Sequence, residues 1–189
     1  MIVGFSIFNN LKNNFDFSKY NQIEIIITHL HNDHAGSLSQ LILYIWFVYH
    51  KKVTIYCNCK NIKNYLDITG TTNEAYEIEN THNNLVFIKT KHVKELDSYG
   101  FKLTINNKSI VYTGDTSTLL PFLPFLKNCS EFYVDVSKNG GVHLKFEDII
   151  DDLEKIQKNG TKVFLMHIDD KEYIKKLSIG TELFDNLEF

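Results

Sequence analysis

The chain has 189 residues, a formal net charge of −3 at pH 7, and a composition of 43% hydrophobic and 23% charged residues. A chain of this length can bury one core, so we expect a single domain spanning residues 1–189. The acidic balance gives no electrostatic case for a large polyanionic partner. All 20 basic residues are lysines. Without the arginine fork, any bound phosphate must be held by metal ions, lysine ammonium groups, hydroxyls or backbone N–H groups.

Cysteines and apolar runs bear on the compartment. Cys57, Cys59 and Cys129 have no zinc-ribbon spacing, so we interpret them as reduced thiols of a cytoplasmic protein. The apolar run at residues 41–48 is shorter than the ~20 residues of a membrane span, and it predicts a buried helix without membrane contact. Residues 1–5 have no basic region and no cleavage signal, so we expect no secretion.

The first half of the chain alternates predicted strands and helices. A β-branched run predicts a strand at residues 23–28, and Gly36-Ser37 opens a helix that runs to residue 49. A strand at 53–57 and a short helix at 61–68 follow. The polar stretch at 73–84 predicts a loop.

The second half continues the alternation. Strands are predicted at residues 85–90, 101–106 and 109–113, and the turn formers at 106–108 join the last two into a hairpin. A strand at 132–136 precedes an amphipathic helix at 146–157, which the Asn159-Gly160 pair ends. A strand at 161–166 and a short helix at 171–176 complete an α/β pattern.

Histidines and aspartates gather at the predicted strand ends, where loops usually carry function. They are His29, Asp33, His34, His92, Asp115 and His167. A set of imidazoles and carboxylates without cysteine suits zinc, manganese or iron. In the segment from His29 to His34, the close spacing would let alternate side chains face opposite sides of a cleft.

His29-x-His31-x-Asp33-His34 resembles the signature of the metallo-β-lactamase superfamily. Three further marks follow in the family's order: His92 in "TKHVKELDSYGFKL", Asp115 in "VYTGDTS" and His167 in "VFLMHID". The resemblance spans residues 23–169, and four marks in order argue against a chance surface cluster. It implies the αββα sandwich fold of that superfamily.

The resemblance also implies two divalent metal ions, with zinc expected and manganese as the alternative. His29, His31 and His92 match the ligands of the first metal. Asp33, His34 and His167 match the ligands of the second metal, and Asp115 matches the bridging carboxylate. Asp33 is also a candidate for orienting the nucleophile.

Within the superfamily, "HVKELDSYGFKL" and "YTGDT" look closest to the phosphodiesterase branch. That branch includes ribonuclease Z, the phosphonate-pathway cyclic phosphodiesterases and phage enzymes that degrade cyclic mononucleotides. Asp135 in "FYVDVS" and His143 in "GGVHLKFEDI" match an acid and a histidine of ribonuclease Z. The resemblance implies that His143, oriented by Asp135, protonates the leaving oxygen. The alternative is that His143 is only a polar residue at a helix entry.

Two departures from the family pattern shape the prediction. The chain carries Ile2-Val3 where relatives have an Asp-containing segment, so we expect a fold that lacks the usual first strands. An uncovered sheet edge would favour a homodimer. There is also no long Gly/Pro-rich arm of the kind that ribonuclease Z uses to grip tRNA.

The predicted function is therefore a dinuclear metal phosphodiesterase acting on a small cyclic nucleotide or a related diester. A tRNA 3′-processing endonuclease is the nearest alternative and predicts salt-dependent tRNA binding. A lactam or thioester hydrolase would not need Asp135 and His143. A truncated, non-catalytic ligand-binding relative is the remaining alternative, and the intact ligand set argues against it.

Overall fold

The computed structural model describes residues 7–177 of the chain. Two compact units make up this part, one up to His82 and one from Asn83 onward. Each unit is described by itself, and the single domain stays a prediction. The expectations on the first five residues and on Ile2-Val3 lie outside the described residues.

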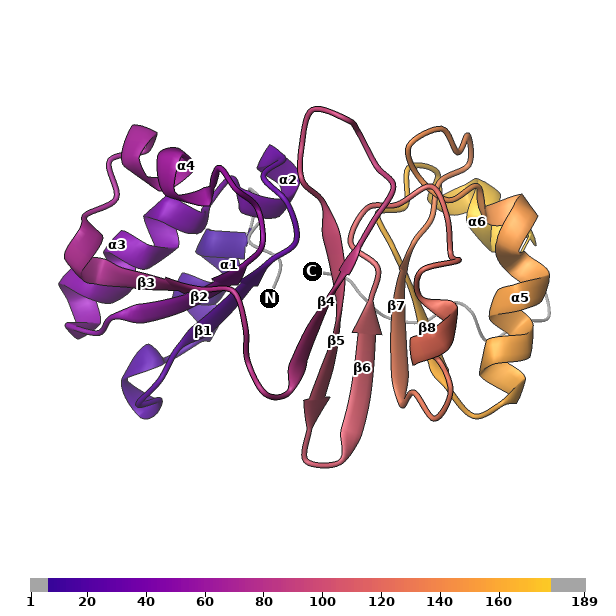
Figure 1. Ribbon diagram of the computed structural model, residues 1–189, viewed down its shortest axis with the longest axis horizontal. Helices are drawn as coiled ribbons and strands as arrows, with labels where there is room; N and C mark the ends of the chain where they lie inside the picture. Colours follow the sequence, from indigo (N-terminus) through magenta and orange to yellow (C-terminus); the bar gives the residue numbers. More distant parts are fainter. Residues whose placement is uncertain (1–6, 178–189) are drawn as a thin grey trace. The chain divides into compact units, whose positions relative to one another are not determined.

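The first unit contains a parallel sheet of three strands in the order β1-β2-β3 (Figure 1). The strands are β1 (Glu24–Ile27), β2 (Val53–Cys57) and β3 (Tyr76–Glu79). The helical segments are α1 (Ile7–Asn14), η1 (Phe17–Lys19), α2 (Asn32–Ala35), α3 (Leu38–Tyr49), α4 (Ile62–Ile68) and η2 (Asn73–Ala75). Helices between successive parallel strands are the expected crossover connections.

Helix α3 explains the apolar run at residues 41–48. Leu38, Leu41, Ile42 and Ile45 are fully buried and follow the helical period. The expected burial is wrong at the C-terminal end of the helix, where Phe47 is 65% exposed and Val48 is 53% exposed. Within residues 7–177, no helix is both long and apolar enough to cross a membrane.

The loop predicted at residues 73–84 is wrong, because this stretch contains β3. Tyr76 is buried and pairs with Val53, while Glu77 and Glu79 are exposed. The Thr54 hydroxyl donates a hydrogen bond of 2.9 Å to Glu77. Charged side chains are typical of an edge strand. Because of them the stretch has a polar composition, which led to the prediction of a loop although its residues alternate.

The second unit contains a sheet of five strands in the order β4-β5-β6-β7-β8. The strands are β4 (Leu85–Lys89), β5 (Tyr99–Ile105), β6 (Lys108–Tyr112), β7 (Glu131–Asp135) and β8 (Lys162–Met166). β5 runs antiparallel to both β4 and β6, and β6, β7 and β8 are parallel. The C-terminal ends of β4, β6, β7 and β8 therefore lie at the same edge of the sheet.

The predicted hairpin between β5 and β6 is confirmed. Asn106 and Asn107 have φ of 49° and 64°, the two left-handed positions of a tight hairpin turn that asparagine tolerates. The remaining helices are η3 (Leu123–Phe125), α5 (Phe146–Lys158) and α6 (Lys171–Leu177). In Figure 1, α5 and α6 lie on one side of the five-stranded sheet.

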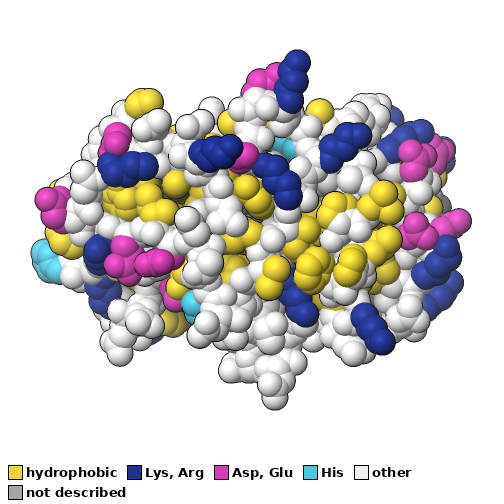
Figure 2. All heavy atoms as spheres, viewed as in Figure 1, with side chains coloured by type: hydrophobic (Ala, Val, Ile, Leu, Met, Phe, Trp, Pro, Cys, Tyr) yellow, Lys and Arg dark blue, Asp and Glu magenta, His cyan; other side chains and the backbone are white. Residues whose placement is uncertain are grey.

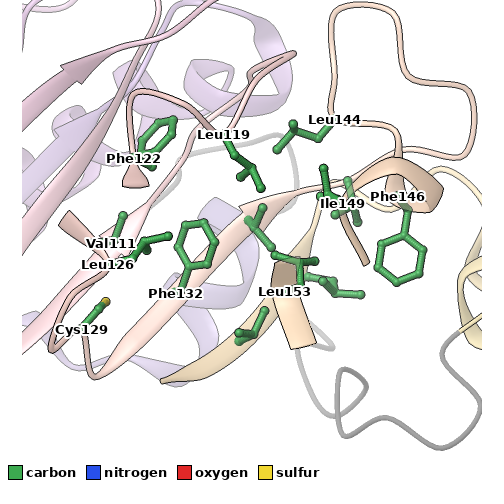
Figure 3. Packing of buried hydrophobic residues seen from close by; sticks show 14 of the residues in the cluster. Val111, Leu119, Phe122, Leu126, Cys129, Phe132, Leu144, Phe146, Ile149 and Leu153 are labelled. Atoms are coloured by element: carbon green, nitrogen blue, oxygen red, sulfur yellow. The ribbon is translucent and has the colours of Figure 1, made fainter. Parts of the chain in front are cut away.

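The core of the second unit joins α5 to the sheet (Figure 3). Phe132 of β7 and Phe146 and Leu153 of α5 are fully buried. Phe122, from the segment between β6 and β7, packs in the same cluster. The parallel strands and their covering helix are thus held rigidly, and the loops at the strand ends are built on this core.

Replacing Gly100 with alanine should destabilise the second unit. The added carbon would lie 2.5 Å from the carbonyl oxygens of Tyr112 and Thr113 and from the Phe122 ring. We expect a loss above about 3 kcal/mol, beyond the usual range for overpacking, because two of the clashing atoms are backbone. Urea unfolding followed by circular dichroism measures the loss.

Gly160→Ala is the matched control for this prediction. Gly160 has φ of 93° with no atom within 4 Å of an added carbon, so only backbone strain opposes the substitution. That strain is about 1–2 kcal/mol. Equal losses in the two variants would contradict the close approach at Gly100.

Tyr133 should make unfolding dependent on alkaline pH. Burial, with a hydrogen bond from its hydroxyl to Glu131, raises the pKa of Tyr133 from 10.0 to about 12. The folded protein thus holds this proton more tightly, and the stabilisation is complete below pH 10 and lost as pH rises through about 12.

Tyr133→Phe keeps the ring that stacks on Phe164 and cannot titrate. We expect its free energy of unfolding to fall less steeply than that of the wild type between about pH 9 and 12. Denaturant unfolding across this range is the measurement. Parallel curves for the two proteins would show that Tyr133 does not titrate as described.

Candidate active site

Four of the predicted site residues belong to the first unit, in the segment after β1. They are His29, His31, Asp33 and His34. His31 occupies the N-cap position of α2, with φ of −66° and ψ of 150°. Asp33 and His34 lie within the single turn of α2. The expected alternation of side chains along an extended loop is therefore wrong for Asp33 and His34, because a helical turn sets the directions of their side chains.

Two close pairs of possible ligand atoms form within this segment. His29 Nε2 lies 3.0 Å from His31 Nδ1, and His34 Nε2 lies 3.5 Å from an Asp33 carboxylate oxygen. His29 and His34 are buried, and their ring centroids are 4.1 Å apart.

Thr28 contributes a hydroxyl that the sequence analysis did not single out. It lies 3.2 Å from His29 Nδ1 and 3.4 Å from His34 Nδ1. Contacts at Nδ1 fix the orientation of a ring and leave Nε2 as the nitrogen that can bind a metal. Its position directly before the first histidine is the signal that could have identified it.

The other five predicted site residues belong to the second unit and gather at one edge of its sheet. They are His92, Asp115, Asp135, His143 and His167. Asp135 is the last residue of β7, and His167 directly follows β8. Asp115 comes three residues after the end of β6, and His92 comes three residues after the end of β4. The shared strand direction brings these four residues together.

Asp115 is the buried centre of this group. One of its oxygens, Oδ2, lies 3.6 Å from His92 Nε2, 3.8 Å from His167 Nε2 and 4.0 Å from His143 Nδ1. Gly114, with φ of 56°, turns the chain directly before Asp115. His167 also has a left-handed φ of 59°, a conformation that is uncommon among non-glycine residues and that histidine adopts more readily than most.

His92 has a defined tautomer when its ring is neutral. Its Nδ1 lies 3.1 Å from the Val142 carbonyl oxygen, which can only accept a hydrogen bond. Nδ1 therefore carries the proton, and Nε2 faces Asp115 as an electron-pair donor. Ser117 supports this segment, because its backbone N–H and its hydroxyl both donate to the Lys91 carbonyl.

Asp135 and His143 form a hydrogen-bonded pair. His143 Nδ1 lies 2.9 Å from Asp135 Oδ2 and 3.2 Å from Oδ1. The same Oδ2 accepts a hydrogen bond of 2.9 Å from the Thr116 backbone N–H. Because a carboxylate accepts, His143 donates from Nδ1, and Nε2 is the nitrogen that can exchange a proton with a reacting group.

Burial raises the pKa of Asp135 above its ordinary value. The hydrogen bond from His143 acts in the opposite direction, and the neighbouring Asp115 adds a smaller upward shift. The pair thus combines a carboxylate removed from water with a histidine positioned to share its charge.

Ser137 and Asp169 are further residues at this edge that the sequence analysis did not identify. The Ser137 hydroxyl donates a hydrogen bond of 2.8 Å to Asp169, and the Lys138 backbone N–H donates one of 2.9 Å. The signal for Asp169 was its place two residues after His167, at the end of a strand that already carries a candidate ligand.

The donor set of the second unit fits a divalent metal ion. Two ligands bound tetrahedrally at about 2.0–2.1 Å from zinc are about 3.4 Å apart. In the second unit, the 3.6 and 3.8 Å separations of His92 and His167 from Asp115 are close to this value. Asp135, His143 and His167 form another group whose ligand atoms lie within 4.8 Å of one another.

Solved structures of other proteins share the fold of this chain. The metallo-beta-lactamase fold protein YhfI from Bacillus subtilis has a TM-score of 0.72 and 17% identity, covering 96% of this chain and 79% of that one. Human tRNase Z, short form (ELAC1), has a TM-score of 0.63 and 15% identity, covering 90% and 82%. A diphosphatase from the PhnP family has a TM-score of 0.59 and 17% identity, covering 88% and 67%. The expected metallo-β-lactamase fold is confirmed.

Sequence comparison identifies the family. No curated protein matches the chain significantly. The family described as Anti-Pycsar protein Apyc1 matches residues 57–184, which is more than half of the chain. This range contains His92, Asp115, Asp135, His143 and His167, and the segment from His29 to His34 precedes it. The chain belongs to the Anti-Pycsar protein Apyc1 family.

Proposed function

We propose that this protein is a metal-dependent hydrolase that cleaves a phosphodiester bond, most favourably in a small cyclic nucleotide or a related diester. The observation that carries the proposal is the Asp135–His143 pair next to Asp115 and His167 in the second unit. A metal-assisted hydrolase of lactams does not need an acid–histidine pair besides its metal ligands. An enzyme that cleaves an alkyl phosphodiester does need one, because it must protonate a poor leaving group.

The resemblance to the superfamily assigns the metal ligands. His29, His31 and His92 would hold one ion and Asp33, His34 and His167 the other, with Asp115 between them. Two divalent ions, when bound, lower the pKa of water and neutralise the phosphate oxygens during in-line attack. Zinc suits this set of imidazoles and carboxylates, and manganese is the alternative.

His143 then acts as the proton donor. Asp135 holds the proton on Nδ1 and stabilises the ring when it is positively charged. The proton that moves is on Nε2, and it passes to the oxygen that leaves phosphorus. We also assign to Asp33, besides its ligand role, the orientation of the attacking group from its place in the first turn of α2.

The charge distribution favours a small substrate over tRNA. The chain has a net charge of −3 and no arginine. On the face drawn in Figure 2, lysine and acidic side chains are interspersed, without a broad field of one sign. A tRNA enzyme depends on such a field, because phosphate contacts supply most of its affinity. The motif resemblance to enzymes of cyclic mononucleotides points the same way. The cytoplasmic location and the homodimer stay predictions.

Activity tests this proposal directly. Protein reconstituted with zinc or manganese should hydrolyse bis(p-nitrophenyl) phosphate and at least one 3′,5′-cyclic nucleotide. His143→Ala should lower kcat for the cyclic nucleotide about 10²- to 10⁴-fold, the usual contribution of general acid catalysis. The loss should be smaller for bis(p-nitrophenyl) phosphate, whose leaving group needs no proton.

His50→Asn is the matched histidine control. His50 is exposed at the end of α3 with φ of 53°, a conformation that asparagine tolerates. Its activity should equal that of the wild type. Cleavage of a tRNA precursor with salt-dependent binding, and none of cyclic nucleotides, would replace the proposed substrate with the alternative one.

Metal content provides a second test. The purified wild type should bind about two divalent ions per chain, as a dinuclear site requires. His31→Ala and His92→Ala each change a ligand that the resemblance assigns to the first ion, and each should lower the content by about one ion. Elemental analysis after dialysis measures this, with His50→Asn again as the control. A wild type that binds no ion would overturn the proposed mechanism.

A further inference from the structure

The segment 137–143, which we call the His143 loop, carries two contacts of the candidate site. Its last residue supplies the His143 ring, which hydrogen-bonds Asp135 and stacks on His167 with ring centroids 4.4 Å apart. The neighbouring Val142 carbonyl accepts the hydrogen bond from His92. The conformation of this loop therefore sets the positions of both histidines.

The loop has little helical or strand structure of its own. Gly140 and Gly141 have φ of 72° and 82°, in a region that most residues avoid. The backbone closes the base of the loop, where the Ser137 N–H donates to the Leu144 carbonyl and the Phe146 N–H donates to the Ser137 carbonyl. Backbone hydrogen bonds at the base do not fix the glycine-containing part of the loop. That part needs further contacts to hold one conformation.

Asp169 supplies those contacts from the segment that follows β8. Its Oδ1 accepts from the Lys138 N–H at 2.9 Å, and its Oδ2 accepts from the Ser137 hydroxyl at 2.8 Å. With its proton directed to Asp169, the Ser137 oxygen accepts from the N–H groups of Asn139 and Gly140, at 3.1 and 3.2 Å. One carboxylate thus orders four consecutive residues of the loop.

We infer that Asp169 is a positioning residue, which anchors the His143 loop and so directs His143 at the leaving group and His92 at its ligand position. The catalytic part of this inference rests on the proposed function. Asp169 acts on the reaction through the loop, because its two oxygens accept hydrogen bonds from Ser137 and Lys138.

The neighbouring Asp170 provides a control that distinguishes the hydrogen bonds of Asp169 from the mere loss of a negative charge near the loop. Asp170 accepts from the Tyr173 N–H at the start of α6 and forms an ion pair of 2.8 Å with the Lys138 ammonium group. It touches the same loop residue, but only through a flexible and solvated side chain. Asp170→Asn keeps the acceptor for Tyr173 and removes the ion pair, so it is the matched control.

The experiment is a double-mutant cycle at saturating zinc, with a 3′,5′-cyclic nucleotide and bis(p-nitrophenyl) phosphate as substrates. Asp169→Ala should lower kcat for the cyclic nucleotide about 10- to 100-fold, as losses of supporting residues usually do. It should affect bis(p-nitrophenyl) phosphate less, as His143→Ala does. At saturating zinc the position of His92 no longer limits metal binding, so the remaining effect of both substitutions runs through His143. Combining them should then cost no more than His143→Ala alone.

A thermal melt of each variant checks folding, and Ser137→Ala provides a milder disruption if Asp169→Ala does not fold. Multiplying effects in the double variant, or an equal loss in Asp170→Asn, would overturn the anchoring role. So would a loss confined to KM.

A readout without turnover separates this inference from the proposed function. In the zinc-loaded protein, ¹⁵N spectra of the histidine rings report which nitrogen of His143 carries the proton, and His143→Ala identifies its signals. Asp169→Ala should shift or broaden the His143 signals, and Asp170→Asn should leave them unchanged. Unchanged signals in Asp169→Ala would overturn the inference even in an active enzyme. A protein that hydrolyses neither diester but shows the shift would refute the proposed function alone.

Discussion

The buried carboxylate of Asp135 is the constraint on which the candidate site of the second unit depends. A carboxylate removed from water is costly unless it is hydrogen-bonded, and an unpaired one costs several kcal/mol. Asp135 is 1% exposed and accepts hydrogen bonds from the Thr116 N–H and from His143. Because these two partners come from different loops, satisfying this one group ties the Asp115 segment to the His143 loop.

The strand directions provide the framework for this arrangement. β6, β7 and β8 are parallel and packed by α5, so Asp115, Asp135 and His167 emerge at one edge without any long-range loop having to find them. Ligands and reacting groups gather at the carboxyl ends of strands in such sheets. Segments without regular structure, such as the His143 loop, are then held in place by polar side chains that bind their backbone.

Sequence reasoning succeeded where one local signal decided the structure. The two asparagines of the hairpin turn predicted the β5–β6 pairing, and the β-branched run at residues 23–28 predicted β1. Sequence reasoning failed where an element depends on strand pairing or is too short to carry a pattern. β3 is a charged edge strand whose formation depends on β2, and α2 is a single helical turn too short to produce a periodic pattern. Exposed Phe47 and Val48 show that an apolar run fixes a helix without fixing which residues it buries.

The sequence by itself determined the donors of the candidate site, because histidine and aspartate at strand ends in the order of a known superfamily identify a chemistry before any fold is seen. It could not show which nitrogen of each ring is directed at a ligand, since Thr28, Val142 and Asp135 set this through contacts that no motif spacing encodes. It also could not reveal Asp169. A carboxylate becomes an anchor only when the pairing of β7 with β8 brings its oxygens to Ser137 and Lys138, 32 and 31 residues away in the chain.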